Sequence, residues 1–124
     1  MISTDAVVVL PNGFVTVERL NPNQRINCFG EYYSWLKKID YSLRRGILIN
    51  TKHFDIVCDG NQRFISDTGE VIKAKDLTLC DHIRTINGLD FIVKLESIDE
   101  FIEMANLTTN SSLYIANGFI LMSE

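Results

Sequence analysis

The chain has 124 residues and a mass of 14.1 kDa, so the sequence predicts a single domain over residues 1–124. With 46% hydrophobic and 23% charged residues it can fill a core, which excludes a disordered or low-complexity chain. The net charge of −4 and a pI near 5.1 disfavour nucleic acid as a partner.

The sequence contains no apolar run long enough to span a membrane and no basic-then-apolar leader. Its three cysteines are an odd number at irregular spacing, which favours a reducing compartment over a disulfide framework. We therefore expect no membrane association, no signal peptide and a cytoplasmic or virion location.

Short apolar runs separated by turn residues predict four β-hairpins in chain order. Their paired runs are Ala6–Leu10 with Phe14–Val17, Phe64–Ile65 with Val71–Ile72, His82–Ile86 with Phe91–Val93, and Leu113–Ala116 with Phe119–Leu121. Asn-Gly pairs at 12–13, 87–88 and 117–118 lie between three of these pairs of runs. Ile47–Ile49 and Phe54–Cys58 are two further strands. This density of turns predicts an all-β domain.

Two stretches have a less definite period. Tyr32–Leu43 fits either a helix or a strand, and Ile98–Ala105 fits a short helical turn. The prediction is therefore a compact all-β domain with at most one or two short helical turns.

Four segments of the chain then resemble, in order and spacing, those of one family. They are Met1–Gly13, Cys58–Phe64, Ala74–Ile83 and a closing block made of Asn106–Thr108 and Leu113–Leu121. In this order they resemble the Hint domain, the β-fold shared by inteins and hedgehog autoprocessing domains. The resemblance implies a Hint-like fold and, for active members, self-cleavage or splicing of the backbone.

The chain departs from the family at each position that would carry this chemistry. The positions are Met1 for the nucleophile, Asp59 and Gln62 for the Thr and His of the second block, and Ser112, Met122 and Ser123 for the His, His and Asn of the closing block. A thioether cannot attack a carbonyl, and an amide cannot deliver a proton near neutral pH. A serine cannot form the succinimide that would release a C-terminal segment. We therefore expect no catalytic residue and a catalytically inactive Hint-like domain.

The alternative from another class is an autoprocessing domain with a shifted nucleophile, for which Ser3, Cys58 and Cys80 are the candidates. The alternative for the cysteines is a purely structural role as small hydrophobic core residues. His53, Cys58, Cys80 and His82 have poor spacing for zinc, because no Cys-x-x-Cys is present. We expect no metal, no cofactor and no small-molecule substrate.

A cluster of aromatic and basic residues is the candidate partner-binding surface. Its members are Tyr32, Tyr33, Trp35, Lys37, Lys38, Arg44 and Arg45. Such aromatics can simply cover a core edge, and base stacking is a weaker alternative given the net acidity. Tyr, Trp and Arg are also typical anchors of protein interfaces. We expect a structural or protein-binding module that engages a protein partner or a second copy, in a virion- or phage-type assembly.

Overall fold

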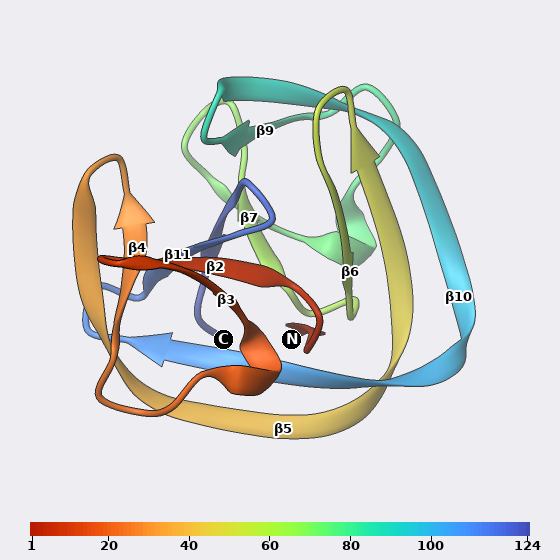
Figure 1. The fold of residues 1–124 in the computed structure, drawn as a ribbon. Helices are drawn as coiled ribbons and strands as arrows, with labels where there is room; N and C mark the ends of the chain where they lie inside the picture. The colour runs from red at the N-terminus through yellow and green to blue at the C-terminus, as the bar shows by residue number, and fades with distance from the viewer.

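The computed structural model describes all residues from 1 to 124 and contains strands and two 3-10 turns but no α-helix (Figure 1). No helix in it is long and apolar enough to cross a membrane. The strands are β1 (Ile2–Ser3), β2 (Val7–Leu10), β3 (Gly13–Thr16), β4 (Arg25–Phe29), β5 (Tyr32–Thr51), β6 (Asp55–Cys58), β7 (Arg63–Ile65), β8 (Val71–Lys73), β9 (His82–Thr85), β10 (Gly88–Thr109), β11 (Leu113–Ala116) and β12 (Phe119–Met122). The turns are η1 (Val17–Arg19) and η2 (Ala74–Asp76). The predicted all-β class, with two short helical turns, is confirmed.

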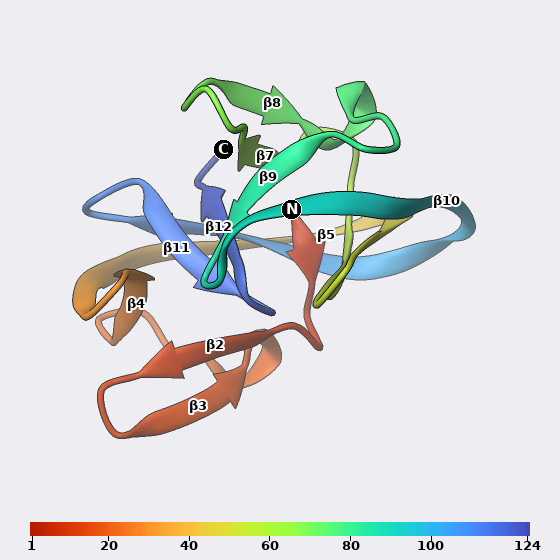
Figure 2. The same ribbon diagram turned by 90° about the horizontal axis from the view of Figure 1, so that it is seen from above.

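Two long strands, β5 with 20 residues and β10 with 22, form a curved antiparallel ribbon around the shorter strands (Figures 1 and 2). Their pairing runs from Thr51 opposite Ile92 to Leu36 opposite Thr109. The stretch Tyr32–Leu43 is therefore a strand. The helical turn considered for Ile98–Ala105 is wrong, because this segment lies within β10, with only a register shift between Ile98 and Phe101. Pairing with β5 satisfies backbone groups that a short isolated helix would leave to solvent.

The order of elements repeats along the chain. The series β2, β3, η1, β4 and β5 returns as β7, β8, η2, β9 and β10, and 57 residues separate Val17 from Ala74 as well as Arg25 from His82. The two 3-10 turns also have nearly the same flanking dihedral angles. The sequence shows no long repeat, because the two halves share backbone geometry and hardly any side chains.

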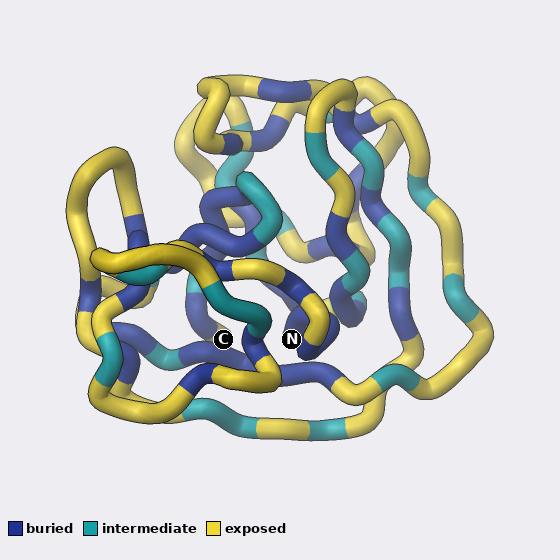
Figure 3. The backbone as a smooth tube through the Cα atoms, in the orientation of Figure 1, coloured by how far each residue is buried: buried dark blue, intermediate teal, exposed yellow.

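The core lies between the ribbon and the hairpins that it encloses (Figure 3). Its largest fully buried side chains include Tyr114, Phe64 and Phe119, and the rings of Phe64 and Phe119 meet edge to face at 5.8 Å. Each such buried ring adds about 1.5–3 kcal/mol of hydrophobic stabilisation to the core. Ile2 is also fully buried, which anchors the N-terminal strand in the middle of the molecule.

Turn residues fall close to where the sequence predicts them. Asn117 and Gly118 have φ values of 49° and 84°, as a type I′ hairpin turn requires. The first hairpin turns at Pro11 and Asn12, one residue before the predicted Asn-Gly pair, so Gly13 begins β3.

Cys80 lies in the left-handed region with a φ of 72° and is exposed. The interpretation of the cysteines as core residues therefore holds for the buried Cys28 and Cys58 but is wrong for Cys80.

Candidate functional site

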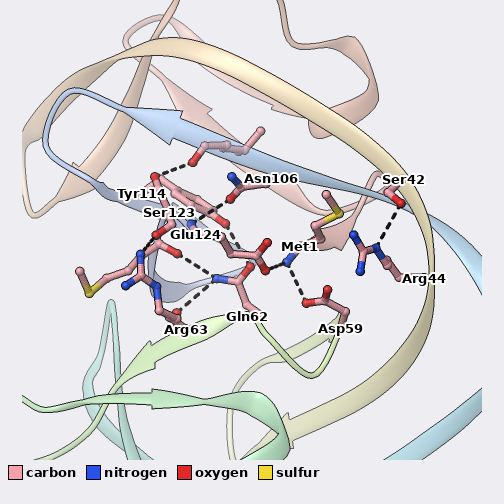
Figure 4. A network of polar contacts seen from close by, with 12 residues as sticks. Met1, Ser42, Arg44, Asp59, Gln62, Arg63, Asn106, Tyr114, Ser123 and Glu124 are labelled. Carbon is pink, nitrogen blue, oxygen red and sulfur yellow. Dashed lines mark hydrogen bonds and ion pairs between the residues drawn. The ribbon is translucent and has the colours of Figure 1, made fainter.

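The first residue lies in the centre of the fold because β1 is sandwiched between two other strands. Ile2 pairs with Cys58 of β6 on one side and Ala105 of β10 on the other. The Met1 amino group donates a hydrogen bond of 2.9 Å to Asp59 Oδ1 and also contacts Glu124 Oε1. The backbone N–H of Asp59 donates in turn to the Met1 carbonyl at 2.9 Å. Asp59 therefore holds residue 1 at both its nitrogen and its carbonyl, and Figure 4 shows the contact with the nitrogen.

Gln62 lies beside this pair and is fully buried. Its Nε2 donates to the carbonyl of Met122 at 3.3 Å and to that of Arg63 at 3.2 Å, and its Oε1 accepts from the Tyr114 hydroxyl at 3.3 Å. Burial raises the pKa of the Tyr114 phenol, against the opposing effect of the Gln62 hydrogen bond. Tyr114 is thus held as a neutral donor, and the amide of Gln62 is fully used in joining β7, β11 and β12.

The end of the chain is fixed by a second set of contacts. The Ser123 hydroxyl donates to the Leu107 carbonyl at 2.6 Å and accepts the Thr109 N–H at 3.4 Å. The Arg63 guanidinium contacts the Ser123 carbonyl, and the Glu124 N–H donates to Asn106 Oδ1 at 3.1 Å. Both the carbonyl and the amide nitrogen of the 123–124 peptide bond are therefore held by side chains (Figure 4).

Five of the six positions singled out from the sequence come together here: Met1, Asp59, Gln62, Met122 and Ser123. Ser112 takes part through its backbone, because its carbonyl accepts the Ser123 N–H at 2.9 Å. Ser112 itself is exposed and has a φ of 65°. We call this cluster, with its supporting side chains, the central site.

Sequence reasoning missed four supporting side chains: Arg63, Asn106, Tyr114 and Glu124. The first three lie in segments that carry the Hint resemblance, directly next to positions that were singled out or within the closing block. A search of those segments for polar residues with no expected catalytic role would have found them.

The three candidates for a shifted nucleophile lie in different surroundings. Burial raises the pKa of the Cys58 thiol far above its ordinary value, with the nearby amino terminus acting in the opposite direction. A protonated, fully buried thiol is a poor nucleophile. Ser3 is also buried, and Cys80 lies in the exposed turn that precedes β9.

The residues tested for metal binding do not form one group. Cys58 ends β6, directly before Asp59 of the central site, and Cys80 lies in its exposed turn. His82 packs against the ring of Phe91, and His53 Nδ1 lies 3.2 Å from Asp90 Oδ2. No cluster of three or more His, Cys, Asp or Glu side chains suitable for a metal ion is present.

The predicted partner-binding residues fall into two separate groups. Tyr32, Tyr33 and Trp35 lie at the β4–β5 hairpin with exposed fractions of 72%, 37% and 50%, and the Arg25 guanidinium lies 5.5 Å above the Trp35 ring. The exposed Lys37 and Lys38 follow directly. We call this group, Arg25 included, the aromatic cluster.

The second group lies about ten residues further along β5. Arg45 lies 5.3 Å over the Phe101 ring and 3.3 Å from Asp99, and Arg44 Nε donates to Ser42 Oγ at 3.1 Å. Ten residues of extended strand span roughly 33 Å along the chain. Arg44 and Arg45 therefore do not extend the aromatic cluster.

Comparison with known proteins identifies the fold. No family model and no curated protein matches the sequence. Among solved structures, the gp41-1 intein superposes with a TM-score of 0.84 at 17% identity over 98% of this chain and 97% of that one. The MchDnaB-1 intein superposes with a TM-score of 0.86 at 13% identity, over 99% of this chain and 100% of that one. A variant of the Ssp DnaB mini-intein superposes with a TM-score of 0.88 at 18% identity, over 98% of this chain and 92% of that one. The chain has the Hint fold of intein domains, as its sequence segments indicate.

Proposed function

We propose that this Hint-fold domain has lost self-splicing and acts as a structural or protein-binding module. The observation that carries the proposal is the state of the central site. Residue 1 offers a thioether, Gln62 offers an amide bound to Tyr114 and Met122, and the Ser123 hydroxyl is held between two backbone groups. The thioether cannot attack a carbonyl, the amide cannot act as a general acid, and a serine cannot form the succinimide, so these residues hold strand ends together instead.

The competing function is autoprocessing through a shifted nucleophile. A fusion carrying a folded domain before residue 1 and another after residue 124 tests it directly. We expect the intact mass to stay unchanged over days at pH 6 to 8, with or without a thiol. A splicing-competent intein between the same flanks is the positive control.

Any release or joining of the flanks would contradict the proposal. In that case Ser3→Ala, Cys58→Ala and Cys80→Ala, tested one at a time, would identify the nucleophile. A mass change abolished by one of them would assign the autoprocessing function to that residue.

The partner surface that we propose is the aromatic cluster. It combines three exposed rings with a guanidinium stacked on one of them, the composition of protein-interface anchors, and two lysines lie beside it. Its positive charge favours a partner, or a second copy, that presents carboxylates. An assembled particle of the virion or phage type is the setting we propose for such an adaptor.

The aromatic cluster makes a testable contribution to binding. Trp35→Ser and Tyr32→Ser should each weaken binding of a purified partner at least tenfold, because exposed aromatic anchors carry most of an interface's affinity. Leu43→Ser, at an equally exposed site on the same strand, is the matched control and should leave affinity within twofold. Titration calorimetry measures all three, and equal losses would exclude the aromatic cluster as the docking surface.

A further inference from the structure

Strand β3 lies at the outer end of the sheet and pairs with β2 alone. In Figure 2 the β2–β3 hairpin stands apart from the rest of the fold, with β3 on its outer side. An exposed strand edge offers unpaired backbone groups to any extended segment that can reach it.

The register of the hairpin determines which backbone groups are unpaired. The loop has two residues, so Leu10 and Gly13 form the first hydrogen-bonded pair and pairs alternate from there. The Val17 N–H donating to the Ala6 carbonyl at 2.9 Å fits this alternation. The N–H and C=O groups of Phe14 and Thr16 therefore point away from β2, toward the open edge.

The side chains beside this edge are apolar and exposed. Phe14 is 78% exposed, and Val7 and Val9 on the neighbouring strand are exposed as well. A hollow of about 290 Å³ lies alongside, lined by Val7, Phe14, Val15, Thr16, Glu18 and Arg19. The Thr16 hydroxyl oxygen is buried and has no hydrogen-bond partner in the protein.

The repeated half of the fold provides a natural comparison. Strand β8 also pairs with one strand only, and Phe14, Val15 and Thr16 correspond to Val71, Ile72 and Lys73. Strand β8 has Lys73 within it and Glu70 just before it, the usual protection of an edge against pairing. Strand β3, Gly-Phe-Val-Thr, has no charge, no proline and no bulge.

We propose that the open edge of β3 binds an extended peptide segment of a partner protein, which adds as a strand. The segment carries apolar side chains at alternate positions and no charge opposite Phe14, because the edge and its hollow offer apolar surface there. A second copy is the weaker occupant. Two four-residue edges bury far less than the roughly 800 Å² per partner that a stable dimer needs, whereas an added strand gains main-chain hydrogen bonds.

A soluble model peptide tests the edge, namely acetyl-Lys-Thr-Val-Thr-Val-Thr-Lys-amide. We expect it to bind the 124-residue chain and to slow hydrogen exchange of the Phe14 and Thr16 amides by at least tenfold, since these N–H groups become paired. The same peptide N-methylated at alternate residues keeps its side chains but cannot form the ladder, and it should not slow exchange.

Two lysine variants distinguish specific binding at this edge from nonspecific binding of the peptide elsewhere on the protein. Phe14→Lys should weaken peptide binding at least tenfold, while Val71→Lys, at the corresponding place on β8, should change it less than twofold. Circular dichroism melting checks that both variants fold. Three results would each overturn the proposal: the peptide fails to slow exchange of the Phe14 and Thr16 amides, the N-methylated peptide binds equally well, or the two variants lose peptide affinity equally. Dimer formation at the same edge in sedimentation experiments would also overturn it in favour of a second copy.

Discussion

Replacing Gly118 with alanine is expected to lower the free energy of unfolding by about 2–5 kcal/mol. Gly118 has a φ of 84°, and an alanine Cβ there would lie 2.4 Å from a carbon of the Phe54 ring. The left-handed backbone costs an alanine about 1–2 kcal/mol. The ring, which packs edge-on against Phe119 at 6.1 Å, must also move, and such overpacking costs about 1–3 kcal/mol.

The same turn connects other elements, which limits relaxation. The Gly118 carbonyl accepts the Ile86 N–H at 2.9 Å, while the Asn117 side chain bonds the Val7 N–H and the Asp55 carbonyl. A loss of this size is a large share of the stability of a small domain. Urea unfolding followed by circular dichroism measures it.

Gly88 is the matched control. Its φ is 88°, but no atom lies within 4 Å of a Cβ built on it. Gly88→Ala should therefore show only the backbone part of the loss, about 1–2 kcal/mol. In a Phe54→Ala background, Gly118→Ala should cost no more than Gly88→Ala does in the parent chain. An equal loss for Gly118→Ala and Gly88→Ala in the parent chain would disprove the steric argument.

The turns were the most predictable feature of this fold, for the reason that Gly118 illustrates. Asn-Gly pairs mark three of the hairpins and Asp67-Thr68-Gly69 marks the fourth, and such residues favour the backbone angles of tight turns, so all four hairpins could be placed within a residue or two. Cys80 shows the limit of this approach, because a left-handed cysteine carries no local signal. No turn was predicted at that position.

The long ribbon was less predictable because its conformation depends on pairing with distant residues. Ile98–Ala105 has a helix-like pattern, yet it pairs with Gly46–Tyr41 more than fifty residues away. Tyr32–Leu43 remained undecided for the same reason. Tertiary contacts override a local period of this kind.

The sequence predicted the main positions of the central site but not the side chains that support them. Family resemblance located Met1, Asp59, Gln62 and Ser123, but a motif of reactive residues cannot indicate which neighbours hold them. Arg63 contacts the Ser123 carbonyl, and the Tyr114 hydroxyl donates to the Gln62 amide oxygen. Both contacts depend on where β7, β11 and β12 meet.

Asp90→Asn should destabilise the protein by about 2 kcal/mol near neutral pH and much less in acid. The Asp90 carboxylate is buried and accepts the His53 backbone N–H at 3.1 Å, with His53 Nδ1 at 3.2 Å. Burial alone would raise its pKa, but hydrogen bonds from Thr51 and from the ring and backbone of His53 outweigh burial and lower the pKa below the ordinary 3.8. An asparagine at this position has one acceptor oxygen in place of two. Its NH₂ group would face donor groups that the second carboxylate oxygen can accept from.

The sign of the pH dependence follows from the lowered pKa. A carboxyl whose pKa is lower in the folded state stabilises the protein fully above its unfolded pKa, and this contribution is lost as the pH falls through the folded value. The difference between parent and Asp90→Asn should therefore be fully present at pH 5 and shrink below about pH 3.8. Asp99→Asn removes an exposed carboxylate paired only with Arg45 and should leave the unfolding free energy unchanged throughout. A difference for Asp90→Asn that stays constant down to pH 2.5 would show that the hydrogen-bonding shape of the side chain matters there and its charge does not.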